Sequence, residues 1–433
     1  MKTLSYTRFA VIVAASPLFS QSLPQWDDEV RAIQADPRYQ HALEVIDRDY
    51  PRFIDELIEL TEIPAPPFGE TARGTAYLAK LRELGLEDPI RDAEGNIIAI
   101  RRGAGGPMLA VAAHLDTVFP AGTDVRVRRE GTRLFAPGIG DDTAALVTIL
   151  AVVRALDEAN IRTSSDLLII GDVGEEGPGD LRGMKHLFGQ GRYRNDIEMF
   201  VSIEGGRQTD ITTSALGSKR YRATFRGPGG HSYSAFGIVN PAFAMGNAIR
   251  KLSEIEVPEF PRTTFNVGVI GGGTSVNSIP FESWMEVDLR SEDSEQLNDL
   301  SEHFVQLMEE AVAEENASRR TGQGAIELEL EVIGERPSGE TPLDAPIVQR
   351  TAAVFRSFGI DPTFSRSSTD SNIPISLGIP AITIDRGGIG GRSHSLDEWV
   401  DVSQEETVRG IQVVLTTILA IAGMEDEQAE EIQ

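Results

Sequence analysis

Short apolar runs alternate with amphipathic segments along most of the chain. Four apolar runs have the length and composition of buried strands: residues 108–113, 167–170, 199–203 and 381–384. Residues 143–156 and 347–358 instead repeat their apolar positions at helical spacing, as do residues 40–60, where Pro51 predicts the start of a new helical turn. This alternation predicts an α/β fold in which helices flank a largely parallel sheet.

A different pattern interrupts the alternation between residues 216 and 335. The order there is strand, helix, two strands, helix and strand, which is typical of a compact α+β, ferredoxin-like βαββαβ unit. We therefore expect a discontinuous α/β domain, built from residues 23–215 and 336–425, with the βαββαβ unit inserted into it. Residues 426–433 are acidic and are expected to form a solvated tail.

Residues 1–22 have the pattern of a secretory signal peptide. Lys2 and Arg8 precede an apolar run at 9–15, and small residues follow where cleavage could occur. This interpretation predicts a secreted or periplasmic protein, and the alternative is an amphipathic tail on a cytoplasmic protein. The run is too short to span a bilayer, and no later segment approaches the roughly 20 apolar residues that a membrane helix needs.

The net charge and the lack of cysteine narrow the class of function. The 433 residues include 40 Lys+Arg and 67 Asp+Glu, which gives a formal net charge of −27 and argues against nucleic-acid binding. Without cysteine the chain can form no disulfide, thiolate metal site or cysteine nucleophile. A metal ion would have to be bound by Asp, Glu and the six histidines.

Side chains that can bind metal ions follow the predicted strands. In chain order they are His114 and Asp116 after the first run, Asp141 and Asp142 before a helix, Glu175 and Glu176 after the second run, Glu204 after the third and His394 after the fourth. In open α/β sheets, ligands bind beyond the carboxyl ends of the strands. Taken singly, each element also has an ordinary structural explanation, such as an acidic turn or a helix N-cap. Together, two histidines and several carboxylates are the ligand set of a hydrolytic zinc site, in which carboxylates can bridge two ions.

Five motifs make nearly the whole chain resemble a known family of co-catalytic zinc peptidases and amidohydrolases. The motifs are HLDTVFP at 114–120, APGIGDDTAA at 136–145, GDVGEEGPGDLRGMKHL at 171–187, GPGGHSYSAF at 227–236 and GGRSHSLDEWV at 390–400. The family includes carboxypeptidase G, aminoacylase, acetylornithine deacetylase, succinyl-diaminopimelate desuccinylase and tripeptide aminopeptidase. The resemblance implies a catalytic domain with a mixed sheet, and it implies that the inserted unit is a lid that forms a homodimer interface.

The resemblance also implies a role for each residue at the strand ends. By this correspondence Asp141 bridges two divalent metal ions, His114 and Glu204 complete the ligands of one ion, and Glu176 and His394 complete those of the other. Glu175 would be the general base, and Asp116 would hold the His114 imidazole in its ligating tautomer. Family members often have a cis peptide bond after the bridging aspartate, here Asp141–Asp142. Zinc is the expected metal, with cobalt or manganese as alternatives.

The resemblance indicates a catalytic role for His231 and substrate-binding roles for Asn277 and Arg290, all three in the inserted unit. A glycine-rich turn makes Gly388 a further candidate for substrate binding. His231 matches a lid histidine that stabilises the tetrahedral oxyanion across the dimer interface, so an isolated protomer would have little activity. Asn277 and Arg290 match residues that bind the substrate carboxylate, and backbone N–H groups near Gly388 could add to the same site. Structural alternatives stay open: a turn for His231, an ion pair for Arg290 and a simple loop for the glycines.

The predicted activity is metal-dependent hydrolysis of amide or peptide bonds in small peptides or N-acyl amino acids, by an exopeptidase or a deacylase. Two alternatives stay open: a carbamoyl or ester hydrolase on the same fold, and a non-catalytic binding protein that retains the metal ions. The complete set of ligands and base argues against the binding protein, because a decayed site would be expected to lose one of them. The sequence does not distinguish recognition of the free amino end from recognition of the free carboxyl end.

Overall fold

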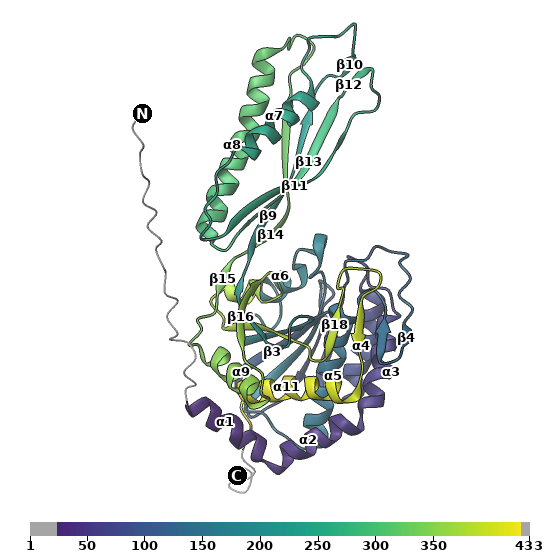
Figure 1. Cartoon of the computed structure of the whole chain (residues 1–433), viewed down its shortest axis with the longest axis vertical. Helices are drawn as coiled ribbons and strands as arrows, with labels where there is room; N and C mark the ends of the chain where they lie inside the picture. Colours follow the sequence, from purple (N-terminus) through teal and green to yellow (C-terminus); the bar gives the residue numbers. More distant parts are fainter. Residues whose placement is uncertain (1–23, 426–433) are drawn as a thin grey trace, which may run out of the picture.

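The structure is a computed structural model that describes residues 24–425, and it contains two units (Figure 1). The main unit is a sheet with helices on both faces, and the second unit is an elongated sheet with two helices on one face. The predicted signal peptide at 1–22 and the predicted acidic tail at 426–433 lie outside the described residues. Among the helices of the described part, none is long and apolar enough to cross a membrane.

The main sheet is mixed, with parallel strands at its centre. Its order is β1 (Glu87–Arg91), β2 (Ile97–Arg101), β6 (Ser165–Asp172), β3 (Gly106–His114), β7 (Ile197–Glu204), β17 (Ala381–Asp385), β8 (Asp210–Ala215) and β15 (Gly339–Glu340), and β16 (Thr363–Ser367) pairs with β8. The four predicted strands lie in β6, β3, β7 and β17, which are parallel neighbours. Strands β1, β2, β8 and β15 each run antiparallel to the next strand toward the centre. The β1–β2 loop is too short for the crossover that a parallel pair requires.

Helices cover both faces of the main sheet. On one face lie α2 (Pro37–Arg48), α3 (Tyr50–Thr61), α5 (Ala144–Glu158), α9 (Pro346–Ser357) and α11 (Gln404–Ala422), and on the other lie α6 (Arg182–Gly189) and α10 (Asn372–Ser376). α5 is buried on nearly all sides because α2 and α3 pack over it. Its buried Arg154 therefore pairs with Glu56 of α3 at 2.9 Å. The break between α2 and α3 lies at Asp49, two residues before Pro51, as the sequence predicts.

A small antiparallel sheet lies beside the carboxyl ends of the central strands. Its order is β18 (Ile389–Gly391), β19 (Trp399–Asp401), β5 (Arg133–Phe135) and β4 (Arg128–Glu130). The backbone N–H of Ala136 donates to the carbonyl oxygen of Glu398 at 3.1 Å. This pairing places the segment that follows β5 beside the segment that precedes β19, although the two are more than 250 residues apart.

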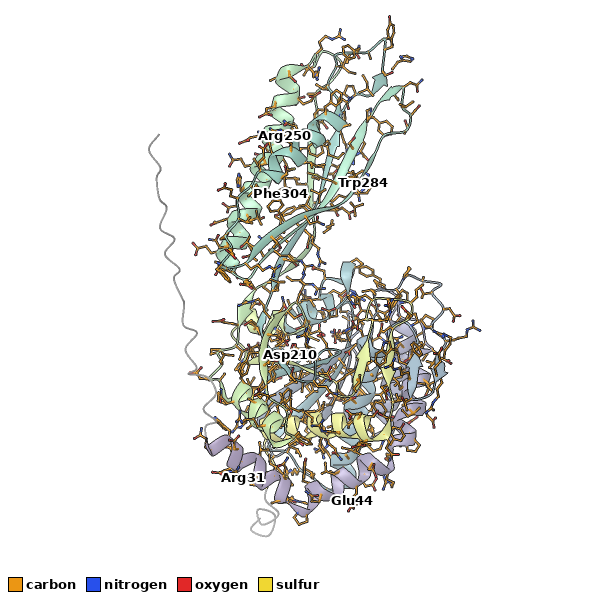
Figure 2. The ribbon with its side chains drawn as sticks, viewed as in Figure 1. Arg31, Glu44, Asp210, Arg250, Trp284 and Phe304 are labelled. Atoms are coloured by element: carbon orange, nitrogen blue, oxygen red, sulfur yellow. The ribbon has the colours of Figure 1, made fainter. Side chains whose placement is uncertain are left out.

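The second unit is a four-stranded antiparallel sheet with helices on one face. Its order is β11 (Thr263–Gly272), β13 (Glu282–Ser291), β9 (Gly217–Arg226) and β14 (Glu327–Arg336), and its helices are α7 (Pro241–Ser253) and α8 (Ser294–Ser318). The order of these elements along the chain is the predicted βαββαβ. Phe304 of α8 is buried against the sheet with its ring 5.0 Å from that of Tyr221, and Trp284 lies on the opposite face against Arg222 (Figure 2).

Two chain segments connect the units and lie side by side. The first contains Leu216, between β8 and β9, and the second contains Pro337, between β14 and β15. Asn372 of α10 donates through Nδ2 to the carbonyl oxygens of both residues, at 2.9 Å each. A single buried amide therefore joins the two connecting segments.

Candidate metal centre

The candidate site lies where the central parallel strands end. Its residues are His114 at the end of β3, Asp141 before α5, Glu175 and Glu176 in the loop after β6, Glu204 at the end of β7 and His394 between β18 and β19. Because the carboxyl ends of parallel strands meet at one edge of a sheet, residues from distant parts of the sequence converge there.

Asp141 lies between the two histidines. Its Oδ1 is 3.0 Å from Nε2 of His114, and its Oδ2 is 3.1 Å from Nε2 of His394. The same His394 nitrogen lies 2.8 Å from Oε1 of Glu176. The Asp141–Asp142 peptide bond is cis, as the resemblance implies. With one oxygen directed to each imidazole, Asp141 has the arrangement expected of a bridging carboxylate.

Two groups of potential ligand atoms lie close together. One group joins His114, Glu175 and Glu176, and the other joins Asp141, Glu176 and His394, with the atoms of each group within 4.8 Å of one another. Because Glu176 belongs to both groups, they form one continuous cluster. The structure therefore brings together five of the residues predicted from the sequence, while their individual roles as ligands or base stay predictions.

Glu204 lies near this cluster, but within residues 24–425 it belongs to neither group. Its Oε1 accepts a hydrogen bond from Oγ of Ser202 at 3.0 Å. Burial, reinforced by the charge of Glu175, raises the pKa of Glu204 to about 8. The assignment of Glu204 as a terminal ligand stays a prediction.

Asp116 fixes the loop that contains Glu175 and Glu176. Its Oδ1 accepts hydrogen bonds from the N–H groups of Gly174 at 2.9 Å and Glu175 at 3.1 Å, and its Oδ2 accepts one from Glu176 at 2.9 Å. Nδ1 of His114 lies 3.0 Å from the backbone carbonyl oxygen of Asp116 and 3.8 Å from its carboxylate. The backbone, rather than the predicted carboxylate, thus contacts the imidazole, and the carboxylate positions the loop.

Two residues that the sequence analysis did not identify position the Asp141 loop. Glu398 accepts hydrogen bonds from the N–H groups of Gly140 at 2.7 Å and Asp141 at 2.8 Å, while Nε of Arg386 donates to the carbonyl oxygen of Gly140 at 3.0 Å. Both side chains are buried. In the sequence, only the position of Glu398 in the HSLDEWV motif, four residues after His394, could have indicated its role.

Burial and close charges shift the pKa values of the site. Hydrogen bonds with Asp141 and Glu176 raise the pKa of His394 to about 10. Burial acts to raise the pKa of Asp141, but hydrogen bonds with the two histidines outweigh burial and lower this pKa overall. Burial raises the pKa of Glu175 to about 7, although the charge of Arg336 opposes the rise. Without a metal ion, these shifts keep a proton on His394 at neutral pH and leave Asp141 ionised.

The cluster and the residues that contact it contain more buried carboxylates than arginine partners. Asp116, Asp142, Glu175 and Glu176 are all buried, and Arg336 is the arginine that forms an ion pair with one of them. Within the described chain, Oδ1 of Asp142 has no hydrogen-bond partner. Buried carboxylates are stable when they are paired or coordinate a metal ion. A donor set of imidazole nitrogens and carboxylate oxygens, without thiolates, fits zinc and related divalent ions.

Among residues 24–425, His231, predicted to be catalytic, and the three predicted substrate-binding residues do not contact the cluster. His231 and Asn277 lie at the remote tip of the second unit, where β10 (Gly230–His231) pairs with β12 (Ser278–Ile279) (Figure 1). Nε of Arg290 donates to Asp288 at 2.6 Å, and the carbonyl oxygen of Gly388 accepts a hydrogen bond from Gln208 at 2.6 Å. In the part of the chain that the structure describes, no hydrogen bond or ion pair connects these four residues to the five clustered residues.

Comparison with known proteins identifies one family. The family model described as peptidase family M20/M25/M40 matches residues 110–420, a span that includes every residue of the cluster. A succinyl-diaminopimelate desuccinylase of Methylobacillus flagellatus is 23% identical over 353 residues, which are 77% of this chain and 89% of that protein.

Solved structures show the same fold. Aminopeptidase PepT from Bacillus cereus superposes with a TM-score of 0.68 at 23% identity and covers 86% of this chain and 99% of its own. The YxeP protein of Bacillus subtilis is described as a dinuclear metal-binding peptidase of the M20 family. It superposes with a TM-score of 0.62 at 17% identity, and the match covers 86% of this chain and 99% of YxeP.

Proposed function

The chain belongs to peptidase family M20/M25/M40 and is a hydrolase of carbon–nitrogen bonds, and we propose that it cleaves amide bonds in small peptides or N-acyl amino acids with two divalent metal ions. The observation that carries the proposal is the position of Asp141 between His114 and His394, with Glu175 and Glu176 in the same cluster. A dinuclear hydrolase needs a bridging carboxylate, terminal ligands and a base near the attacking water. The cluster offers a candidate for each.

The proposed ligand sets follow the resemblance. Asp141 would bridge the ions, with His114 and Glu204 as ligands of one ion and Glu176 and His394 as ligands of the other. When bound, the ions would polarise the substrate carbonyl and make the attacking water more acidic. We favour zinc because it prefers imidazole and carboxylate ligands in hydrolytic sites, with cobalt and manganese as alternatives.

Glu175 is the proposed general base and general acid. Its carboxylate takes a proton from the water that attacks the amide carbonyl and delivers that proton to the leaving nitrogen. One water is consumed, the carbon–nitrogen bond breaks, and a carboxylic acid and an amine are released. In the metal-free site, burial raises the pKa of Glu175 to about 7, which brings its proton exchange close to neutral pH. The hydrogen bond from the Glu175 N–H to Asp116 keeps the loop in place.

The second unit is proposed to act as a lid and as the homodimer interface. His231 and Asn277 lie at its tip, remote from the cluster of their own chain, which supports a site completed by a partner protomer. Tyr233 and Val276 at the same tip are almost fully exposed, at 88% and 102%, and offer apolar surface for a partner. Arg290 stays a proposed carboxylate-binding residue, as does Gly388 through its neighbouring backbone.

A substrate panel tests the proposed activity. The panel contains N-acetyl and N-carbamoyl amino acids and di- and tripeptides with free or blocked ends, and the protein is assayed after zinc reconstitution, with and without chelator. We expect chelator-sensitive cleavage. The end whose blocking abolishes cleavage distinguishes an aminopeptidase from a carboxypeptidase or deacylase. Protein that binds two metal ions but cleaves none of the panel would contradict the proposal and favour a binding role.

Glu175 and Glu176 form a matched pair for mutation. Glu175→Gln should retain both metal ions and lose roughly 10²–10⁴-fold in turnover, because only the base changes. Glu176→Gln removes a proposed ligand and should lose metal. Inductively coupled plasma analysis of bound metal and steady-state rates check both outcomes. Near-normal turnover in Glu175→Gln would show that another residue is the base.

A further inference from the structure

Arg336 contacts the proposed general base from the second unit. It is the last residue of β14, and its side chain is 4% exposed beside the 9% exposed side chain of Glu175. Its Nη1 donates to Oε1 of Glu175 at 2.9 Å, and its Nη2 donates to the backbone carbonyl oxygen of the same residue. One guanidinium therefore binds both the side chain and the main chain of Glu175.

This contact engages only one oxygen of the Glu175 carboxylate. Oε1 is paired with Arg336, and within residues 24–425 no hydrogen bond to Oε2 is formed. The Glu175 carboxylate lies within 4.8 Å of ligand atoms of His114 and Glu176. Nη1 of Arg336 also donates to Oγ of Ser368 at 3.0 Å, which restricts rotation of the guanidinium. A carboxylate held through Oε1 keeps Oε2 available for proton transfer.

Neighbouring contacts attach the lower end of the second unit to the same loop. Asp180 accepts hydrogen bonds from the N–H of Glu335 with its two oxygens, at 3.0 and 2.9 Å. Nη1 of Arg220 on β9 donates to the carbonyl oxygen of Gly177 at 3.2 Å. These contacts fix the end of β14 relative to the loop that contains Glu175, and so they determine where the Arg336 guanidinium lies.

We propose that Arg336 is a positioning residue, which orients the Glu175 carboxylate for proton transfer and makes this orientation depend on the second unit. A planar guanidinium can bind the carboxylate and the backbone carbonyl oxygen of Glu175 at the same time, because its N–H donors have fixed directions in one plane. An ammonium group has no such fixed arrangement of donors. The inference rests on the proposed role of Glu175 as the base. Displacing a catalytic group by about 1 Å can lower the rate about 10²-fold. Loss of the Arg336–Glu175 contact should therefore produce a measurable fall in kcat.

The primary test compares two substitutions of Arg336 with a matched control. Arg336→Met removes the charge and all donors while keeping much of the side-chain length, and we expect kcat to fall about 10²-fold with full metal content. KM should change by less than about threefold, because substrate contacts are retained. Arg336→Lys, which keeps a charge and a donor, should recover part of the loss. Arg222→Met, on the open face of the same sheet with partners Glu286 and Trp284, should leave kcat unchanged.

A double-mutant cycle separates positioning from a general structural role. If Arg336 acts through Glu175, adding Arg336→Met to Glu175→Gln should cost less than about twofold more in turnover. An independent structural role would multiply the two losses in turnover. Multiplied losses, or an unchanged kcat in Arg336→Met with full metal content, would overturn the inference.

Two milder variants keep the test decisive if Arg336→Met does not fold. Arg336→Lys and Ser368→Ala both retain a cation beside Glu175, and each should lower kcat at constant KM, with the smaller effect in Ser368→Ala. Unchanged kcat in both variants would overturn the inference. If Glu175→Gln itself kept its turnover, the proposed base would be wrong, whereas an inactive Glu175→Gln beside fully active Arg336 variants would remove only the present inference.

Discussion

Glu398 binds the backbone of the loop that contains the proposed bridging ligand. Its buried carboxylate accepts hydrogen bonds from the N–H groups of Gly138, Gly140 and Asp141 at 3.0, 2.7 and 2.8 Å. Hydrogen bonds from backbone N–H groups to a carboxylate are among the stronger ones in proteins. Arg386 donates a hydrogen bond to the carbonyl oxygen of Gly140. The loop is therefore held through its N–H groups by Glu398 and through a carbonyl oxygen by Arg386.

We predict that Glu398→Gln weakens metal binding without removing a ligand. An amide has one acceptor oxygen, and its NH2 group would face backbone donors, so the Asp141 loop loses part of its support. Residues that orient metal ligands typically contribute about 10–100-fold to metal affinity, and we expect a loss of that size. Leaving buried N–H groups unpaired should also lower the free energy of unfolding by about 1–3 kcal/mol. Competition with a chromogenic chelator and urea unfolding measure the two effects.

Glu405→Gln is the matched control for this prediction. Glu405 lies in the first turn of α11 and is exposed, so its substitution should change neither metal affinity nor stability by more than about 0.5 kcal/mol. Equal metal affinity in Glu398→Gln and Glu405→Gln would show that the loop keeps its position without the full set of three hydrogen bonds.

The sequence identifies the clustered residues and Asp116, but not Glu398 and Arg336, which contact the cluster from distant parts of the chain. His114 and Glu176 are predictable because each closely follows an apolar run, and the carboxyl ends of such strands meet in space. Glu398 and Arg336 are different, because their partners Asp141 and Glu175 lie 257 and 161 positions away. The one local signal for Glu398 is its place in the HSLDEWV motif, and no local pattern distinguishes Arg336 from ordinary charged residues. Both contacts form only in the folded chain, and that of Arg336 also requires the second unit to pack on the main one.

At the scale of elements, the apolar runs predict the central strands well. Parallel strands are covered on both faces and therefore appear as continuous apolar runs, as in β3, where the last seven residues are all buried. Strand direction at the edges of the sheet was not predicted. The antiparallel pairing of β1 with β2 depends on the length of the intervening turn, which apolar periodicity does not report. The sheet is consequently mixed, as the family resemblance implies, whereas the alternation of elements alone suggested one that is largely parallel.

We predict that Asn372→Leu loosens the junction between the two units. Asn372 is fully buried, and the substitution leaves the carbonyl oxygens of Leu216 and Pro337 without their side-chain donor. Two partly buried acceptors that lose their side-chain donor should lower the free energy of unfolding by about 1–3 kcal/mol. Amide exchange in both connecting segments should become faster, and hydrogen-exchange mass spectrometry with urea unfolding measures these changes.

Asn247→Leu serves as the comparison for the junction variant. Asn247 donates a hydrogen bond to Glu314 between exposed parts of α7 and α8. Its substitution should lower the free energy of unfolding by no more than about 0.5 kcal/mol and should not affect the junction. Unchanged exchange in the connecting segments of Asn372→Leu would mean that the strand pairing on each side suffices to hold them together.

For the whole molecule, the candidate site links stability to pH. Burial raises the pKa of Glu175 from 4.5 to about 7 and that of Glu204 from 4.5 to about 8, and hydrogen bonds raise that of His394 from 6.5 to about 10. Between its ordinary and its raised pKa, each group keeps a proton in the folded chain that the unfolded chain has released. The free energy of unfolding therefore falls as pH rises through these windows, about 4.5–8 for the glutamates and 6.5–10 for His394.

We therefore predict that the metal-free protein loses stability steadily between about pH 5 and pH 9.5, and that bound zinc removes much of this loss because the ions replace the protons. Urea unfolding of chelator-treated and zinc-reconstituted protein across this range measures both curves. Glu204→Gln lacks one of the shifted groups, so its metal-free curve should be flatter than the parent curve, whereas that of Glu405→Gln should run parallel. Constant or rising stability of the metal-free parent would contradict the prediction, and a parallel curve for Glu204→Gln would show that the folded chain keeps no additional proton on Glu204.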